Sequence, residues 1–464
     1  MLTNLLFFIR EKRWFFVAVI VAILMYFLPH PKDLSTEGYH AIIIIVITII
    51  LIIKEPLPLP AIAILMIFLQ VLFGIASANE VASAFMNDAV FFIMGSLMLA
   101  VAIVSQGLDK RLALGIIKIT GNQTWKIVAG FTAISALLSS FIGGHTVTAM
   151  MMPVSLTLIR YASKNQKKII NLTAALLFSV AYGATIGSIG TPSGGGRNAI
   201  VLNYLTKFSQ IEISYLKWMA YAYPMLLLEI PFTIAIILFT FRPEKTNLDS
   251  AVRRLSIDVK HSGSMKPKEY LAIILFILVF LGWVFFSSTI GLGMVALMGV
   301  FAYLAFDLVE WNDLNKSTNW GVVLLFGAAI SIGIQVKNTG AALWLANHFV
   351  EFLSIYITDL TVLRATIAIF LTSLFSNLLS SSATVAVVAP VVLNLGGDLV
   401  ALSFATAISS AFGYFTAVAA PACAIIYSSG LVKSKDFLRA GWKMGIMSII
   451  LLVLMMIFWW PLLG

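Results

Sequence analysis

The chain has 464 residues and a formal net charge of +10; 60% of its residues are hydrophobic and only 11% are charged. Soluble domains are about 25% charged, so this composition excludes a soluble globular protein. Apolar runs long enough to cross a lipid bilayer as helices recur from end to end, which predicts an all-α polytopic membrane protein. A β-barrel is excluded because runs such as 41–53 do not alternate in hydrophobicity.

The basic residues lie mostly in short loops between apolar runs, where they act as topology signals rather than as contacts for nucleic acid. Arg10, Lys12 and Arg13 precede the first apolar stretch, and no small-residue cleavage pattern follows it. We therefore expect an uncleaved first span with a cytoplasmic N-terminus. The single cysteine, Cys423, allows no intrachain disulfide.

The first four spans are predicted at residues 14–29, 40–54, 59–75 and 90–107. The connection around Glu80 and Asp88 has no Lys or Arg and is placed outside. The next connection carries four basic residues, Lys110, Arg111, Lys118 and Lys126, which place it in the cytoplasm. Counting crossings from the N-terminus gives the same sides.

Residues 127–159 contain no charged residue but are too few to cross twice, because two crossings need roughly 40 residues. Basic residues flank this stretch on both sides. A single crossing would put one basic flank outside, so we predict a re-entrant helical hairpin on the cytoplasmic side. Its midpoint, Gly143-Gly144-His145-Thr146, breaks the helix and places polar atoms at membrane depth, where irregular backbone is tolerated only inside protein or along a cavity.

The next span, from Asn171 to about Gly190, runs into a segment in which Pro192 and three consecutive glycines must interrupt the helix. We predict a broken helix here. A return span at 217–240 completes an N-terminal half, residues 1–241. The polar and basic segment 242–269 is then a cytoplasmic linker.

The second half, residues 270–464, repeats the order of elements. Spans are predicted at 270–286, 291–309 and 321–337, followed by a second charge-free stretch, 365–397, centred on residues 380–384. A second break follows at Ala420-Pro421. Crossing counts place this second hairpin and the C-terminus outside, and its flanks lack basic excess. About eleven spans and two re-entrant hairpins thus form inverted-topology repeats, which are typical of secondary transporters with a substrate site at the midplane.

At each hairpin tip the second arm begins a helix, whose N–H groups favour an anion. The two breaks add N–H and C=O groups, and such carbonyls can coordinate Na⁺. The alternative for one Ser/Thr/Gly-rich segment is tight helix packing, but two at matching places in both halves favour a site. The candidate substrate-binding residues are Gly144, His145, Thr146, Gly190, Thr191, Pro192, Ser193, Ser381, Ser382, Ala383, Thr384, Ala420 and Pro421.

His145, Arg197 and Glu229 are the ionisable residues singled out as candidates, because such residues at membrane depth are expensive and often functional. His145 at the first tip could supply a fixed positive charge, a pH-dependent one, or only hydrogen bonds. Arg197 follows the three glycines and could contact an anion or cap backbone carbonyls. Glu229 could bind a proton or make a structural hydrogen bond. The remaining histidines make no metal cluster, so neither a metal site nor a cofactor is expected.

These landmarks together resemble the divalent anion/sodium symporter family, the INDY-like di- and tricarboxylate transporters. The resemblance covers nearly the whole chain: the segment Gly107-Leu108-Asp109-Lys110-Arg111-Leu112, both hairpins and the break Gly190-Thr191-Pro192. The family's tips carry Ser-Asn-Thr motifs that contact substrate carboxylates and help to bind Na⁺. The matching positions here read Gly144-His145-Thr146 and Ser382-Ala383-Thr384, and the second break lacks the family's Pro-Pro-Asn.

The retained threonines favour a carboxylate substrate, whereas the two missing asparagines disfavour Na⁺ coupling. The family also includes Na⁺-independent exchangers, and a positive His145 could replace the charge of a cation. The sequence therefore favours an exchanger of small dicarboxylates such as succinate, malate, fumarate or 2-oxoglutarate. A Na⁺-coupled symporter, or a carrier of sulfate, is the alternative.

The resemblance also implies a homodimer in the cytoplasmic (inner) membrane. The early spans of each half would form a scaffold, and the hairpins, the broken helices and the spans that follow them would form a transport domain that moves like an elevator. An intramembrane enzyme is disfavoured because no paired acids, Cys/His cluster or Ser/Lys arrangement recurs inside the spans. An anion channel is a third possibility, which saturable flux with trans-stimulation would exclude.

Overall fold

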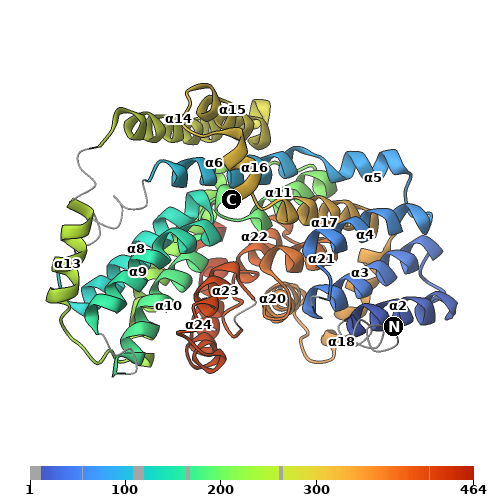
Figure 1. Cartoon of the computed structure of the whole chain (residues 1–464). Coiled ribbons are helices and arrows are strands. Elements are labelled where there is room, and N and C mark those ends of the chain that lie inside the picture. Colours follow the sequence, from blue (N-terminus) through green and yellow to red (C-terminus); the bar gives the residue numbers. More distant parts are fainter. Residues whose placement is uncertain are drawn as a thin grey trace, which may run out of the picture.

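A computed structural model of the chain describes residues 12–54, 56–107, 120–163, 168–260, 265–416 and 419–463. Within these ranges the regular elements are helices, and one isolated bridge pairs Gln123 with Asn247 (Figure 1). The described part contains eight helices that are long and apolar enough to cross a membrane. The prediction of an all-α polytopic membrane protein is confirmed.

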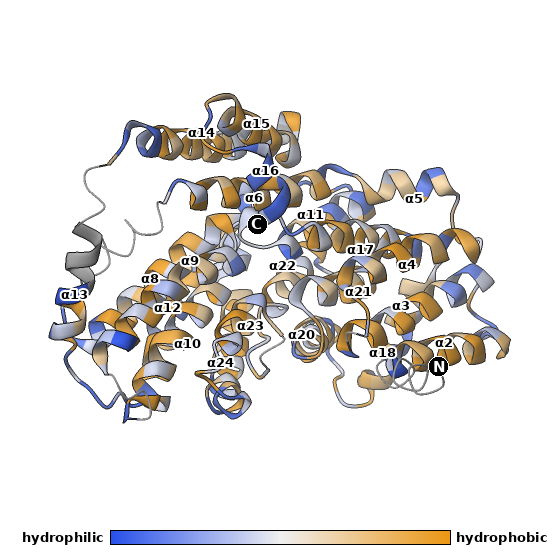
Figure 2. Cartoon of the chain, in the orientation of Figure 1, coloured by the Kyte–Doolittle hydropathy of each residue, from blue (hydrophilic) through white to orange (hydrophobic). Residues whose placement is uncertain are grey.

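Seven of the eight long helices match predicted spans, and the other, at Thr124–Ile142, is an arm of the first predicted hairpin. They are α3 (Thr36–Lys54), α6 (Asp88–Ser105), α8 (Thr124–Ile142), α10 (Ile170–Gly187), α12 (Tyr215–Thr240), α14 (Pro267–Ile290), α17 (Trp320–Asn338) and α24 (Ser434–Leu454) with its continuation to Leu462. Three further predicted spans are shorter apolar helices, α2 (Arg13–Phe27), α4 (Leu59–Leu72) and α15 (Leu292–Ala305). Figure 2 shows hydrophobic residues along these helices and hydrophilic ones mainly in the connections.

The first predicted hairpin is a pair of 19-residue helices, α8 and α9 (Gly144–Ala162), that pack against each other. One residue, Gly143, breaks them, with φ of 84°, a conformation that suits glycine. The position of the break is confirmed. Both arms extend beyond the predicted 127–159, and α8 alone is long enough to cross a bilayer, so re-entrance stays a prediction.

The second hairpin has a different break. Its first arm comprises α19 (Leu360–Thr366), a π-helical turn (Ile367–Leu371) and α20 (Thr372–Ser376). Its second arm is α21 (Ser381–Leu393), whose N-cap Ser380 accepts a hydrogen bond from the Ala383 N–H at 3.4 Å. The break therefore spans residues 377–380 and begins before the predicted centre.

Both predicted helix interruptions are present. In the first half, α10 ends at Gly187 and α11 (Gly196–Ser209) begins after a short 3₁₀ turn, Pro192–Gly194. In the second half, α22 (Leu399–Ser409) and α23 (Pro421–Ser428) flank the other interruption. The helix α10 ends at a glycine, and Pro192 and Pro421 each begin the element that follows an interruption, a position that suits a residue without a backbone donor.

The polar linker between the halves contains a helix that the sequence did not predict, α13 (Asp249–Lys260), which packs against α9. Glu244 precedes it and accepts hydrogen bonds from the N–H groups of Asn171 and Leu172, both at 2.8 Å. The Glu244 carboxylate lies at the N-terminus of α10 and accepts from N–H groups that have no acceptor within α10 itself. The linker thus fastens the start of α10, and it also fastens the start of the first hairpin, because Thr124 Oγ1 donates to the Lys245 carbonyl at 2.6 Å.

The buried side chains form two apolar clusters. One joins α2, α3 and α4 with one face of α17, α18 (Ala341–Ser354) and α21, on the right of Figure 1. The other contains the first hairpin, both broken helices and α12, α14, α15 and α24. Packing between the halves is reciprocal, since α4 packs on α17 and α15 packs on α6. Such an exchange of partners is expected of two repeats.

Candidate functional site

The first tip presents a helix N-terminus. The N–H groups of Gly144, His145 and Thr146 occupy the first turn of α9, where a helix has no internal acceptor for them. All three residues are half-buried, and the Thr146 hydroxyl lies 3.2 Å from His145 Nε2. This end of the hairpin offers unsatisfied donors, a hydroxyl and an imidazole to an anion.

The first hairpin is held against α10 by close backbone contact. A Cβ atom at Gly183 would lie 2.6 Å from the Thr132 carbonyl oxygen, and one at Gly187 would overlap that of Ala136. Gly144 likewise lies against the Ala184 carbonyl, to which Ser139 Oγ donates a hydrogen bond. Small residues four positions apart allow helices to approach this closely. The tip and the start of the first break are therefore one packed unit.

The first break lies beneath this tip and is buried from Gly190 to Gly194. The Thr191 hydroxyl donates to the Ser140 carbonyl and lies 3.0 Å from Ser193 Oγ, which in turn lies 2.8 Å from the Tyr215 hydroxyl. The candidates Gly190, Thr191, Pro192 and Ser193 are thus brought to the first tip. Their hydroxyls are engaged inside the protein in this conformation.

Asn198 is a further residue of the first break, which sequence reasoning missed. Its Nδ2 atom donates to the carbonyls of Ser188 and Thr191, at 2.9 and 2.7 Å, and so bridges the two sides of the interruption. Unwound helices leave carbonyls that need donors or cations. A buried amide directly after a glycine-rich break was the available signal.

The second tip contributes hydroxyls and an N-terminus of its own. Ser381, Ala383 and Thr384 are buried, whereas Ser382 is half-buried. Among the described residues, no group hydrogen-bonds Thr384 Oγ1, which lies in the first turn of α21. Ala383 faces away, toward α3, α4 and α17. The threonine therefore keeps a free hydroxyl, and the alanine serves packing.

Asn377, also missed by sequence reasoning, ties the second tip to the second break. Its Nδ2 atom donates to the carbonyls of Ser373 and Phe412, at 2.9 and 3.1 Å. Its Oδ1 atom accepts from the Phe415 N–H at 3.0 Å. Further along this break, Ala420 is buried, and Pro421 is exposed at the start of α23. Asparagine amides thus bridge carbonyls at both breaks.

The two half-sites interlock. Each tip lies against the break of its own half, while α23 packs on α9 and α10, and α11 packs on α21 and α22. Arg197 Nη2 donates to Ser188 Oγ at 2.6 Å, and its direct contact with an anion stays a prediction. It is buried behind the first break.

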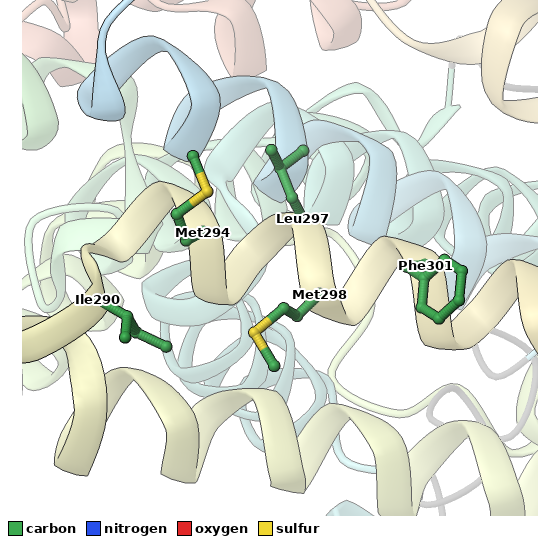
Figure 3. Close-up of a pocket in the computed structure, with 5 residues that line it drawn as sticks. All are labelled: Ile290, Met294, Leu297, Met298 and Phe301. Atoms are coloured by element: carbon green, nitrogen blue, oxygen red, sulfur yellow. The ribbon is translucent and has the colours of Figure 1, made fainter.

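Two other observations limit the chemistry. No group of three or more His, Cys, Asp or Glu side chains in the described ranges could hold a metal ion. An open apolar groove of about 600 Å³ lies along α15, lined by Ile290, Met294, Leu297, Met298 and Phe301 (Figure 3). Its lining does not suit a dicarboxylate, so the tips and breaks remain the candidate anion site.

Curated relatives match over most of the chain. An uncharacterised transporter from Haemophilus influenzae is 26% identical, covering 86% of both chains. The sodium-dependent high-affinity dicarboxylate transporter 3 of Caenorhabditis elegans is 27% identical, covering 85% of this chain and 78% of its own. The sodium-dependent dicarboxylate transporter SdcS of Staphylococcus aureus is 25% identical, covering 93% and 88%.

Two solved structures share the fold. The YdaH transporter of Alcanivorax borkumensis aligns with a TM-score of 0.54 and 15% identity, over 85% of this chain and 90% of its own. MtrF of Neisseria gonorrhoeae aligns with a TM-score of 0.55 and 12% identity, over 93% and 96%. The family described as the sodium:sulfate symporter transmembrane region matches residues 10–464. The chain therefore belongs to this family, the divalent anion/sodium symporters, and is a multi-pass membrane transporter.

Proposed function

We propose that this protein exchanges small dicarboxylates, such as succinate, malate, fumarate or 2-oxoglutarate, across the cytoplasmic membrane without Na⁺. The names of two relatives support the substrate class. The two tips support it as well, because each combines a helix N-terminus with a threonine hydroxyl. Two such ends suit a substrate with one carboxylate at each end.

One observation carries the proposal that Na⁺ is not needed. At each break an asparagine amide donates to two backbone carbonyls, Asn198 in the first half and Asn377 in the second. Carbonyl oxygens at helix interruptions are the groups that hold Na⁺ in carriers of this kind. Here the partial positive charge of an amide already faces these oxygens, so a cation would have to compete with it.

His145 supports the proposal of Na⁺ independence, because its positive charge could replace that of a cation. It stands at the first tip, beside Thr146 and the helix N-terminus, where a cation would otherwise offset the charge of a dianion. An imidazolium held by the protein stays with the empty carrier. The empty carrier would then have to cross the membrane with the positive charge of His145 unpaired, which is costly. This cost favours exchange over net uptake.

We propose an elevator-like movement of one part of the protein against the other. The early spans of each half would serve as a static scaffold at a homodimer interface; in the first half these are α2, α3 and α4, which pack on α17, α18 and α21. The hairpins and broken helices would cross the membrane as a unit, with the first hairpin re-entrant from the cytoplasm and the second from outside. The N-terminus would then be cytoplasmic and the C-terminus outside.

Counterflow in proteoliposomes tests this function. Vesicles loaded with succinate should take up labelled succinate equally in Na⁺ and in choline buffer, and vesicles without internal dicarboxylate should take up little. His145→Asn should impair this exchange, while His348→Asn, on the exposed face of α18, should not. Saturation and trans-stimulation of the flux would exclude a channel.

A Na⁺-coupled symporter is the second candidate, favoured by the sodium dependence in the names of two relatives. It predicts uptake that rises steeply with external Na⁺ in vesicles that contain no dicarboxylate. That result would overturn exchange and would place the cation at carbonyls that the two asparagines leave partly open. Competition of succinate uptake by sulfate would then decide between organic and inorganic dianions.

A further inference from the structure

A buried carboxylate lies outside the candidate anion site. Glu229, in the middle of α12, is fully buried, and its Oε1 atom accepts a hydrogen bond from Ser448 Oγ at 2.6 Å. Among the described residues, no donor reaches its Oε2 atom. Such an oxygen is costly when it is charged, and it accepts a proton without losing a hydrogen bond.

The cation that interacts electrostatically with Glu229 is Arg197. Its guanidinium is buried, and the opposite charges of the two side chains attract each other across the protein interior. Arg197 Nη2 donates to Ser188 Oγ at the first break, while no acceptor within the described ranges reaches its Nε atom. The charge of Glu229 therefore offsets that of Arg197 immediately behind the first half-site.

The second half-site reaches the same carboxylate through hydroxyls. The Tyr414 hydroxyl, from the segment after α22, lies 3.4 Å from Ser448 Oγ, and Tyr414 also interacts electrostatically with Glu229 and Arg197. The Tyr182 hydroxyl of α10 donates to the Tyr414 carbonyl at 3.1 Å. The network around Glu229 thus touches both broken helices.

The charged residues of the other helices packed on α12 have contacts away from Glu229. The α24 cations Arg439 and Lys443 lie against Phe241 and Thr240, at the far end of α12. On α8, Lys126 lies over Trp125 near the start of that helix. Lys268 and Glu269 stand at the start of α14, and Asp398 caps α22 near Tyr221. Within the described ranges, Arg197 and Tyr414 are therefore the titratable groups of other elements that interact electrostatically with the carboxylate.

From this geometry we propose that Glu229 is a proton-binding site, and that Arg197 couples its protonation to the binding of the anionic substrate. With Glu229 ionised, the Arg197–Glu229 pair has no net charge. With Glu229 protonated, one positive charge remains behind the half-sites and attracts a dianion. This proposal rests on the proposed function, because it requires a dicarboxylate at the tips.

Thermodynamic linkage makes the coupling reciprocal. A lower pH should tighten substrate binding, and substrate binding should draw a proton onto Glu229. Each loaded carrier would then move a proton along with its dicarboxylate. Exchange between compartments of different pH would in this way favour entry from the more acidic side.

Titration calorimetry of the purified full chain with succinate tests the coupling. At about pH 7.5 both succinate carboxylates are ionised, so a binding heat that differs between phosphate and Tris buffers reports protons taken up by the protein. We expect uptake in the wild type and its loss in Glu229→Gln, together with loss of the pH dependence of succinate affinity. His145→Asn should bind more weakly but should still take up protons.

Ser448→Ala provides a second variant if Glu229→Gln does not fold. It keeps the carboxylate but removes the donor that stabilises its ionised form, so proton uptake should move to higher pH. Ser403→Ala, a buried serine of α22 whose hydroxyl is not hydrogen-bonded within the described ranges, should leave uptake unchanged.

Equal heats in both buffers for the wild type would overturn the proposal. Proton uptake that persists in Glu229→Gln and disappears in His145→Asn would also overturn it, because the imidazole would then be the acceptor. An unchanged pH dependence in Ser448→Ala would count against it in the same way. Failure to bind succinate at all would instead contradict the proposed function.

Discussion

The two hairpin tips occupy matching places in the two halves but are built differently. A single glycine, Gly143, breaks the first hairpin, and backbone contacts press that hairpin onto α10. A four-residue segment breaks the second hairpin, whose first arm contains a π-helical turn. The second tip is tied to its break by hydrogen bonds of the Asn377 side chain and of the Thr416 hydroxyl, where the first relies on glycine packing and hydroxyls.

This contrast shows which features the half-sites share and which they do not. Both keep a helix N-terminus with a threonine, Thr146 or Thr384, and both bridge break carbonyls with an asparagine. They differ in how firmly the tip is held, and π-turns often accompany functional sites. We infer that the second hairpin is the more adaptable one, suited to gating, while the first fixes the substrate.

The largest expected effect concerns the side of the membrane on which each hairpin's flanks lie, because a cysteine is labelled by an impermeant reagent from one side only. In a Cys423→Ser background, cysteines at Lys126 and Lys168 should react with a membrane-impermeant reagent only from the cytoplasm. Cysteines at Ser354 and Asp398 should react only from outside. The native Cys423 is buried and is removed solely to exclude background labelling.

Reaction of Lys126 and Lys168 positions from opposite sides would contradict this prediction. It would make the first hairpin a true crossing, which the length of α8 allows, and the two tips would no longer be equivalent. A cysteine at Glu310, in the connection before α17, reports on the side of the C-terminal half as an internal control.

The sequence predicted the helices and their interruptions well, since apolar length, glycine and proline act locally. The break at Gly143 and the interruption after Gly187 follow from such residues. The helix α13 was missed because its amphipathic pattern lies in a strongly polar linker, where docking on α9 decides its structure.

The site was predicted less completely. Thr146 and Thr384 lie in the first turn of their helices, as the capping pattern suggested. Asn198 and Asn377 were missed because their role depends on which carbonyls the fold brings within reach, and no local spacing encodes it. Contacts between distant segments, such as that of Asn377 with residues 412–416, need the tertiary structure.

The largest expected change in stability comes from disturbing the close backbone contact between α10 and the first hairpin. Gly187→Ala places a methyl group against the Ala136 backbone, which cannot move aside as a side chain could. We expect a loss of about 3 kcal/mol or more in stability, beyond the usual cost of overpacking. Thermal unfolding followed by intrinsic fluorescence measures it.

Gly195→Ala is the matched control for this variant. Its added Cβ atom meets the Arg197 guanidinium at 3.4 Å, an ordinary contact, and its backbone is extended. This variant should unfold within a few degrees of the wild type. Equal melting of the two variants would mean that close contact with α10 does not hold the first tip.

The next prediction tests whether the amides of Asn377 and Asn198 occupy carbonyls that could otherwise bind Na⁺. Asn377→Asp removes a donor to two carbonyls and leaves oxygen atoms facing one another, which should cost about 1 to 3 kcal/mol in stability. Na⁺ should restore part of this loss, whereas choline should not. Asn198→Asp should behave alike. Melting temperatures in NaCl and in choline chloride give the comparison.

Asn394→Asp controls for the change of chemistry, because among the described residues the Asn394 amide donates to one carbonyl, that of Pro390 in the preceding helix turn. It should show no preference for Na⁺. If Na⁺ stabilises the wild type as much as the two aspartate variants, the amides do not stand in for a cation, and the proposal of Na⁺ independence loses its main support.

The smallest expected effect concerns the two threonine hydroxyls. Thr384 Oγ1 has no hydrogen bond within the described residues, whereas Thr146 Oγ1 lies within reach of His145. A hydroxyl without a partner gains more from a carboxylate, so Thr384→Ala should weaken succinate binding by about 1 to 3 kcal/mol and Thr146→Ala by less. Thr384→Ser, which keeps the hydroxyl, should restore affinity, as measured by calorimetry. An equal loss of affinity in both variants would show that the hydrogen bonds of the two threonines without substrate do not determine how much each contributes to binding. Unchanged affinity in both variants would move the anion site toward Arg197.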